Sequence, residues 1–222
     1  TGFDHSCAID TEGSIECWGR NYYGSLDHPE EGTFVQLDVA AYSACALSES
    51  GEISCWGHNS SNKNNSPTGA FIQVAQGEEH SCAIDTEGYL HCWGDNTYDQ
   101  STPPLGRYVL VSLGYDHSCA LTINGEIHCW GRDDDSRTIP PEGNYVSLSI
   151  GAYSGCALDE NGTASCWGNN TYYQTTLPET NFISLTQGRY HGCGIDMEGD
   201  LRCWGNNGYG QSSTDSDGDG NN

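Results

Sequence analysis

The chain has 222 residues, of which 31 are acidic and only 7 are basic, so its formal net charge at pH 7 is −24. This charge excludes nucleic acid and anionic membrane surfaces as partners, because both would repel the chain. No apolar run approaches the roughly 20 residues of a membrane span, so no membrane insertion is expected. Gly, Ser, Thr and Asn are abundant, which is typical of a short-stranded, turn-rich all-β protein.

Twelve cysteines recur at a fixed period along the chain. They form six pairs whose members lie ten positions apart, and the first members are separated by 38, 37, 37, 37 and 37 residues. The pairs are Cys7 and Cys17, Cys45 and Cys55, Cys82 and Cys92, Cys119 and Cys129, Cys156 and Cys166, and Cys193 and Cys203. A period of this length predicts a repeat architecture with six units.

Each cysteine pair brackets a predicted β-hairpin. In the first unit, a turn signal at 11–13 separates two short β-type runs, and Gly13 suits the left-handed position of a three-residue loop. This loop places Cys7 opposite Cys17 at a non-hydrogen-bonded site, where side chains approach most closely. The other units carry Gly at the same place, at Gly51, Gly88, Gly125, Gly162 and Gly199.

The spacing of the cysteines favours one disulfide per repeat over a metal site. Zinc sites usually contain Cys-x2-4-Cys knuckles, and the sequence has none. Six disulfides imply an oxidising, extracellular compartment, and each is expected to stabilise its hairpin by about 2–3 kcal/mol.

A third β-type run precedes every hairpin except the first. The runs are 34–37, 71–74, 108–111, 145–148 and 182–185, and apolar and polar residues mostly alternate in them. Trp-Gly and a polar loop follow each hairpin, so one repeat supplies three strands and room for a short fourth. Repeated sheets of this size predict a β-propeller; the alternative is a β-solenoid, whose rungs are usually shorter.

Two strings of the chain resemble a known repeat family. They are GEEHSCAIDTEGYLHCWGDNTYDQSTPP (77–104) and GYDHSCALTINGEIHCWGRDDD (114–135), and they are similar to the regulator of chromosome condensation repeat. The compact spacing resembles the short-repeat bacterial branch of this family, which includes beta-lactamase inhibitor protein II. The cysteine pairs make this chain resemble a disulfide-bonded, secreted variant of that branch. The resemblance implies a propeller of six blades, or of seven if a further blade or strand lies outside this chain. A nuclear or chromatin role, known in the wider family, conflicts with the disulfides and the charge.

The turns between each third run and its hairpin are the predicted recognition surface. A propeller gathers equivalent turns at one end of the ring, where they are free to vary. By resemblance to the inhibitor-like relatives, six residues of these turns are expected to contact a protein or glycan: Asp4, Tyr42, Glu79, Asp116, Tyr153 and Tyr190. A polar loop rim with incidental tyrosines is the alternative.

The last residues form a separate acidic segment. Residues 1–211 are assigned to the propeller and 212–222 to an Asp-rich linker, in which Asp215, Asp217 and Asp219 match the opening of a calcium-binding loop. A solvated acidic linker that binds no calcium is the other interpretation, because the sequence lacks a closing ligand at position 12. No other cofactor is predicted.

Other recurring residues are assigned structural roles. The six Trp of the Trp-Gly motifs are expected to pack between blades. His5, His80, His117 and His191 are expected to make one structural hydrogen bond per blade. The run 133–135 is a solvated loop or a cation site, and Asn59, Asn64, Asn161 and Asn169 begin glycosylation sequons.

Together, these features predict a secreted or cell-surface binding module rather than an enzyme, because no catalytic motif is found. One face of the ring would hold a protein or glycan. The alternative is a structural subunit of an extracellular fibre or surface layer that self-assembles by strand or blade complementation.

Overall fold

The computed structural model describes residues 1–213 and shows an all-β fold in six antiparallel sheets. The first sheet has two strands, β1(His5–Ile9) and β2(Ile15–Gly19). The five others have three strands each: β3(Phe34–Val39), β4(Ser43–Ser48) and β5(Ile53–Gly57); β6(Phe71–Gln76), β7(His80–Asp85) and β8(Leu90–Gly94); β9(Tyr108–Leu113), β10(His117–Thr122) and β11(Ile127–Gly131); β12(Ser147–Ile150), β13(Ser154–Leu158) and β14(Ala164–Gly168); β15(Phe182–Gln187), β16(His191–Asp196) and β17(Leu201–Gly205). Two short 3-10 helices, η1(Tyr22–Gly24) and η2(Asp134–Ser136), lie in loops.

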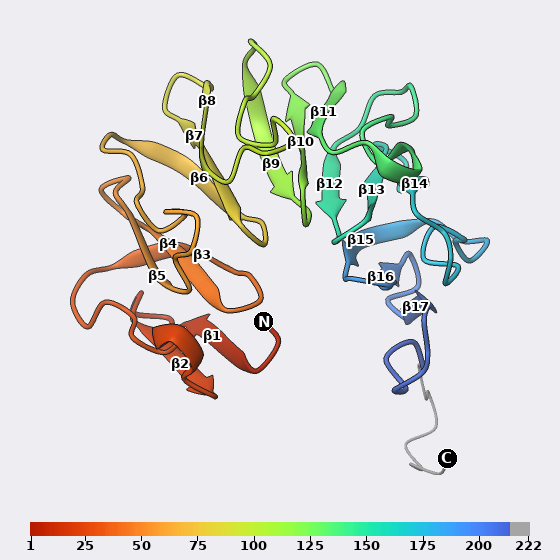
Figure 1. The fold of residues 1–222 in the computed structure, drawn as a ribbon. Coiled ribbons are helices and arrows are strands. Elements are labelled where there is room, and N and C mark those ends of the chain that lie inside the picture. Colours follow the sequence, from red (N-terminus) through yellow and green to blue (C-terminus); the bar gives the residue numbers. More distant parts are fainter. Residues whose placement is uncertain (214–222) are drawn as a thin grey trace.

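The sheets are arranged as the blades of a propeller. Figure 1 shows them following one another in chain order around a common centre, with the ring open between the first sheet and the last. The first strands of successive three-stranded sheets contact one another and lie nearest the axis, whereas the hairpin strands lie outside them. The predicted six-repeat propeller is therefore confirmed, and no sheet in the described residues contains a fourth strand.

The predicted hairpin register is also confirmed. Cys7 pairs with Cys17, Ala8 with Glu16 and Ile9 with Ile15, and the other five hairpins have the equivalent register. Gly13 has a φ of 86°, in the left-handed region. All twelve cysteines form disulfides, one within each repeat. One strand differs slightly from expectation, since β12 begins at Ser147 rather than Tyr145.

The hydrophobic core lies between neighbouring blades. In one cluster, Ile84 of β7 packs against Tyr108 and Val111 of β9, and all three side chains are buried. Small residues such as Ala83 and Ala120, fully buried on the hairpin strands, let adjacent sheets approach closely. A single repeat therefore cannot complete its own core.

Tryptophans connect five of the six blades to the blade before. In each case the indole Nε1–H donates to a main-chain oxygen 30 or 31 positions earlier: Trp56 to Ser25, Trp93 to Lys63, Trp130 to Gln100, Trp167 to Arg137 and Trp204 to Gln174, at 2.6–3.1 Å. Trp18 is the exception, because no described sheet precedes its own, and its side chain is 55% exposed. The expectation that it packs between blades is wrong.

The recurring histidines fill space between a turn and the next blade. His80 and His117 are fully buried, and a Cβ on Gly77 would lie 2.6 Å from the His80 ring. His80 Nε2 lies 2.9 Å from Ser118 Oγ in the next blade. The rings of His5 and His117 have no hydrogen-bond partner within the described residues, so the expectation of one bond per blade holds only for His80 among these three.

Candidate binding surface at the ring mouth

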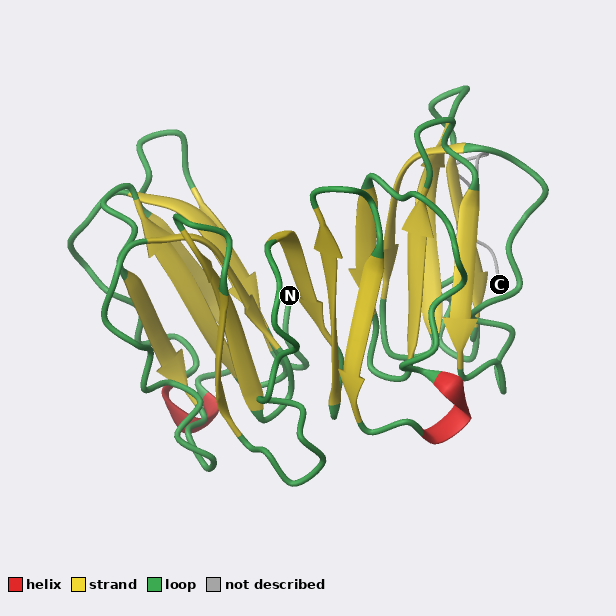
Figure 2. Ribbon diagram, turned by 90° about the horizontal axis from the view of Figure 1, so that it is seen from above, coloured by secondary structure: helices red, strands yellow, loops and turns green. Residues whose placement is uncertain are grey.

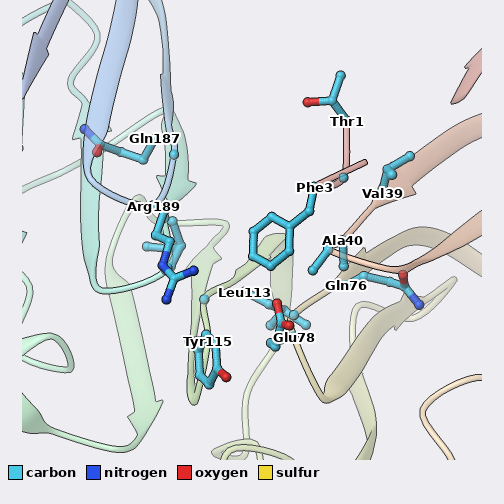
Figure 3. Close-up of a pocket in the computed structure, with 18 residues that line it drawn as sticks. Thr1, Phe3, Val39, Ala40, Gln76, Glu78, Leu113, Tyr115, Gln187 and Arg189 are labelled. Atoms are coloured by element: carbon cyan, nitrogen blue, oxygen red, sulfur yellow. The ribbon is translucent and has the colours of Figure 1, made fainter. Parts of the chain in front are cut away.

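The turns that join each first strand to its hairpin meet at one end of the ring, which we call the ring mouth. They enclose a pocket of about 210 Å³ on the axis, to which all six repeats contribute (Figure 3). The turn residues that line it are Gly2 and Phe3, Ala40 and Ala41, Gly77 and Glu78, Gly114 and Tyr115, Gly151 and Ala152, and Gly188 and Arg189. The convergence of equivalent turns, expected from the repeat, is thus present.

Glycine allows these turns to lie so close together. A Cβ on Gly77 would lie 2.7 Å from the main-chain oxygen of Gly114 in the next turn. Gly114 stands in the same relation to Gly151, also at 2.7 Å. The glycines therefore bring one turn against the next and form the floor of the pocket.

The residue directly after each glycine, or after Ala40, faces the axis. This position holds Phe3, Ala41, Glu78, Tyr115, Ala152 and Arg189. The residues predicted from the sequence, Asp4, Tyr42, Glu79, Asp116, Tyr153 and Tyr190, lie one position later and do not line the pocket. Their main-chain oxygens instead accept hydrogen bonds from the loops that follow the Trp-Gly motifs, for example from Arg20 N to Asp4 O at 2.8 Å.

The predicted residues nevertheless belong to the same end of the ring. Figure 2 shows η1 and η2, which lie in the loops after Trp-Gly, at one common end of the molecule. The tyrosines of these loops touch those of the turns: Tyr23 packs against Tyr42 with ring centroids 5.7 Å apart, and Tyr172 against Tyr190 at 4.9 Å. The mouth therefore has an inner ring of axis-facing residues and an outer ring of turn and loop residues.

Aromatic side chains form two groups that together make an arc across the mouth. We define the aromatic arc as Phe3, Tyr23, Tyr42, Tyr115, Tyr153, Tyr172 and Tyr190. Tyr153 stacks between Tyr115 and Tyr190, with centroids 5.8 and 5.6 Å away and interplanar angles of 20° and 28°. Phe3 meets Tyr42 edge to face at 5.4 Å.

Arg189 joins the two halves of the aromatic arc across the opening of the ring. Its guanidinium carbon lies 5.8 Å from the Phe3 ring of the first repeat, 5.9 Å from Tyr153 and 5.3 Å from Tyr190. Its Nη2 also donates to the Tyr153 hydroxyl at 3.4 Å. These contacts hold the guanidinium by cation–π interactions. Arg189 is not among the residues predicted from the sequence, although its place directly after Gly188 was an available signal.

Two carboxylates of the outer ring, those of Glu79 and Asp116, are already engaged. Glu79 accepts hydrogen bonds from Ser60 Oγ at 2.5 Å and Ser61 Oγ at 3.1 Å, and its other oxygen lies 3.7 Å from His58 Nδ1. Asp116 is buried and pairs with Arg132 at 3.3 Å. Burial nevertheless raises the pKa of the Asp116 carboxyl, and Arg132 only partly opposes this shift.

Lys63, the only lysine of the chain, is buried beneath the mouth. Its Nζ donates to the main-chain oxygen of Glu78 rather than to either neighbouring carboxylate. Burial lowers the pKa of this amine, whereas the nearby charges of Glu79 and Glu78 raise it. Lys63 therefore supports the turn that carries Glu78 and is not a contact residue.

The structure gives no support for a metal centre in the part of the chain that it describes. Residues 1–213 contain no cluster of three or more His, Cys, Asp or Glu side chains suited to a metal ion. In the acidic run 133–135, Asp134 pairs with Arg132 and Asp135 with Arg137. Asp215, Asp217 and Asp219 lie outside the described residues, so the calcium loop and the linker assigned to 212–222 stay predictions.

The fold and the disulfide within each repeat place the chain in the class of disulfide-bonded β-propellers. The sequence profile of the regulator of chromosome condensation (RCC1) repeat matches residues 1–25, 71–100, 108–137, 145–174 and 182–211. The chain belongs to this family. The bacterial branch suggested by the compact spacing stays a prediction.

Solved structures support the same assignment. The chain is similar to the ectodomain of the Physcomitrella patens receptor kinase CR4, with a TM-score of 0.79 and 26% identity, over 92% of this chain and 60% of that one. It therefore spans less than two thirds of the moss ectodomain. None of the curated proteins matches the chain in sequence.

Two more distant structures share the fold. Prp20p of Saccharomyces cerevisiae gives a TM-score of 0.78 at 19% identity, over 92% of this chain and 70% of that one, and is described by its binding to Gsp1p and histones. The ectodomain of the Arabidopsis thaliana receptor kinase ACR4 gives 0.76 at 22%, over 92% and 77%. Structural neighbours thus include receptor ectodomains and a binding protein. No helix in residues 1–213 is long and apolar enough to cross a membrane.

Proposed function

We propose that this propeller is a non-catalytic binding module of a secreted or cell-surface protein, and that it holds a protein partner at the ring mouth. The aromatic arc with Arg189 at its centre carries this proposal. Tyrosine and arginine are the residues that most often dominate the affinity of protein interfaces. The six disulfides and the ectodomain neighbours support an extracellular location.

The stacking of the arc favours a protein partner over a glycan. Tyr115, Tyr153 and Tyr190 form an offset stack with ring centroids 5.8 and 5.6 Å apart, so part of each ring face is taken up by a neighbouring ring. Sugar binding by stacking would need open ring faces. Hydroxyl edges beside a guanidinium instead suit the mixed polar and apolar contacts of a protein interface.

Single alanine variants test the proposal. Oxidised protein carrying Tyr153→Ala or Tyr190→Ala is compared with wild type for capture of extracellular proteins, which are then identified by mass spectrometry. Tyr89→Ala is the control, because Tyr89 is 41% exposed and follows the hairpin loop at the opposite end of the ring. A partner lost from both mouth variants and retained by the control supports the proposal. A partner lost only from the control, with all variants folded by circular dichroism, contradicts it.

One observation favours assembly by complementation as a second function. Among residues 1–213, the first sheet has only two strands. In every other sheet a first strand pairs with the hairpin, and no described strand takes this place beside β1, while Trp18 is exposed. An unpaired strand edge is a template for pairing with another chain. Light scattering of the oxidised protein, with and without calcium, tests it: assemblies that grow with concentration are expected, and a strict monomer overturns this second candidate.

A further inference from the structure

The pocket at the centre of the mouth contains a carboxylate without a counter-ion. The Glu78 side chain lines the pocket and is half-buried, yet it makes no hydrogen bond or ion pair with any residue of 1–213. Lys63 beneath it donates to the main-chain oxygen instead. The neighbouring Glu79 carboxylate, in contrast, is occupied by Ser60, Ser61 and His58.

The walls around Glu78 suit an aliphatic stem that ends in a positive charge. Figure 3 shows Phe3 and Tyr115 pointing into the same pocket as Glu78. Aromatic faces attract ammonium and guanidinium groups, most strongly where water is partly excluded. The floor consists of the small residues Gly77, Gly114 and Gly151 and leaves room for one long side chain in about 210 Å³.

No described basic residue forms an ion pair with Glu78, although the charges of Lys63, Arg189 and His58 partly oppose the rise that burial causes in the pKa of its carboxyl. Arg189 is held against Phe3, Tyr153 and Tyr190 and forms no ion pair with a described carboxylate. Arg132 pairs with Asp116 and Asp134, and Arg137 is buried and pairs with Asp135. The formal net charge of −24 attracts cations to the whole surface, and Glu78 offers a local partner for them.

We infer that the central pocket takes a cationic side chain, lysine or arginine, presented by the partner, with Glu78 as its counter-ion. This inference rests on the proposed function and adds the chemical class of the group that enters the pocket. It also assigns opposite effects to the two charged residues of the pocket, since Glu78 attracts such a side chain and Arg189 repels it.

The probes are Nα-acetyl-lysine amide and Nα-acetyl-arginine amide, titrated into the oxidised protein while the NMR signals of Phe3 and Tyr115 are followed. Uncharged Nα-acetyl-norleucine amide and acidic Nα-acetyl-glutamate amide are the comparison ligands. We expect Glu78→Gln to weaken binding of the cationic probes about tenfold. Glu79→Gln removes the same charge one residue away and is expected to change the affinity less than twofold, whereas Arg189→Gln is expected to tighten binding about twofold to fivefold.

Several outcomes overturn the inference. They are equal losses in the Glu78 and Glu79 variants, equal binding of the norleucine probe, tighter binding of the glutamate probe, or no shift of Phe3 and Tyr115 at the solubility limit of the cationic probes. The proposed function can fail separately. If Tyr153→Ala loses an identified partner and Glu78→Gln keeps its full affinity, the mouth binds protein but the cation pocket is refuted. If the probes behave as expected and the tyrosine variants keep the partner, the proposed face is wrong.

Discussion

At the scale of single residues, backbone strain is concentrated in the loops of the ring mouth. The same loop position has a positive φ in every repeat, at Gly24, Asn62, Asp99, Ser136, Tyr173 and Gly210, and four of these residues are Gly, Asn or Asp, which tolerate this conformation. The fifth repeat carries Tyr173 at this position (φ 64°), and Tyr23 has a positive φ (58°) one position earlier in the loop of the first repeat; the two tyrosines are 71% and 67% exposed. A bulky exposed residue in a strained conformation indicates selection for something other than stability, which agrees with a contact surface.

Replacing Tyr173 with the residue of an equivalent repeat is expected to stabilise the protein. Tyr173→Asn places in this turn the side chain that Asn62 provides in the second repeat, and should raise the free energy of unfolding by about 1 kcal/mol. Urea denaturation without reductant measures the change. Tyr172→Asn is the matched comparison, because Tyr172 has no positive φ and packs against Tyr190. A loss of stability from Tyr173→Asn would show that the tyrosine ring is part of the fold.

The buried histidines predict a fall in stability on the acid side of neutrality. Burial lowers the pKa of His80 and of His117 from 6.5 to about 3. Between these values the unfolded chain binds protons that the folded protein does not, so stability decreases as the pH falls from 6.5 towards 3. His117→Ser introduces the residue found at Ser43 and Ser154, and should reduce this slope by about 1.4 kcal/mol per pH unit. Urea denaturation across this pH range measures the slope, and a slope identical to that of wild type would refute the assignment.

At the scale of secondary-structure elements, the disulfide and the packing of neighbouring blades stabilise each hairpin together. The Cys119–Cys129 bridge has Cys119 fully buried in a core cluster, whereas Cys7 and Cys17 lie in the two-stranded sheet and are only half-buried. Loop closure is the same in both, because both pairs span ten residues. The difference in stabilisation between the two disulfides is therefore a measure of packing rather than of chain entropy.

Removing these two disulfides should have unequal effects. Replacing Cys7 and Cys17 by Ala is expected to lower the free energy of unfolding by about 2–3 kcal/mol, from loop entropy alone. Replacing Cys119 and Cys129 should lower it further, because buried sulfur contacts are lost as well. Chemical denaturation of the two double variants measures the difference. Equal losses would mean that packing adds nothing to the central hairpins.

At the scale of the whole molecule, close contact between successive turns determines how the blades gather around the axis. Gly151 is buried and has an ordinary φ, but a Cβ there would collide with the main-chain oxygen of Gly188. The glycines are therefore required by the approach of neighbouring blades rather than by local conformation. The pocket, the aromatic arc and the position of Arg189 all depend on this approach.

A methyl group at Gly151 is expected to disturb the mouth as well as the fold. Gly151→Ala should lower the free energy of unfolding by about 1–3 kcal/mol through overpacking. It should also shift the NMR signals of Arg189 and Tyr115, which belong to other blades. Gly208→Ala is the control, since only the Asn206 side chain comes near a Cβ there, at 3.2 Å. Unchanged stability and spectra for Gly151→Ala would show that the turns can separate without consequence.

The amino-acid sequence by itself determined the repeat, the register of every hairpin and all six disulfides. These features depend on contacts within ten or so residues, where the loop length and the two-residue period of a strand leave one arrangement. It also predicted that equivalent turns gather at one end of the ring, because the repeat places them at the same point of every blade. Only the tertiary structure decided that Glu78 and Arg189 face the axis while Glu79 and Tyr190 do not, that Trp18 is exposed, and that Arg189 lies among rings from three repeats. Those outcomes follow from the curvature of the ring, which arises from packing between residues 31 to 186 positions apart and leaves no local pattern in the sequence.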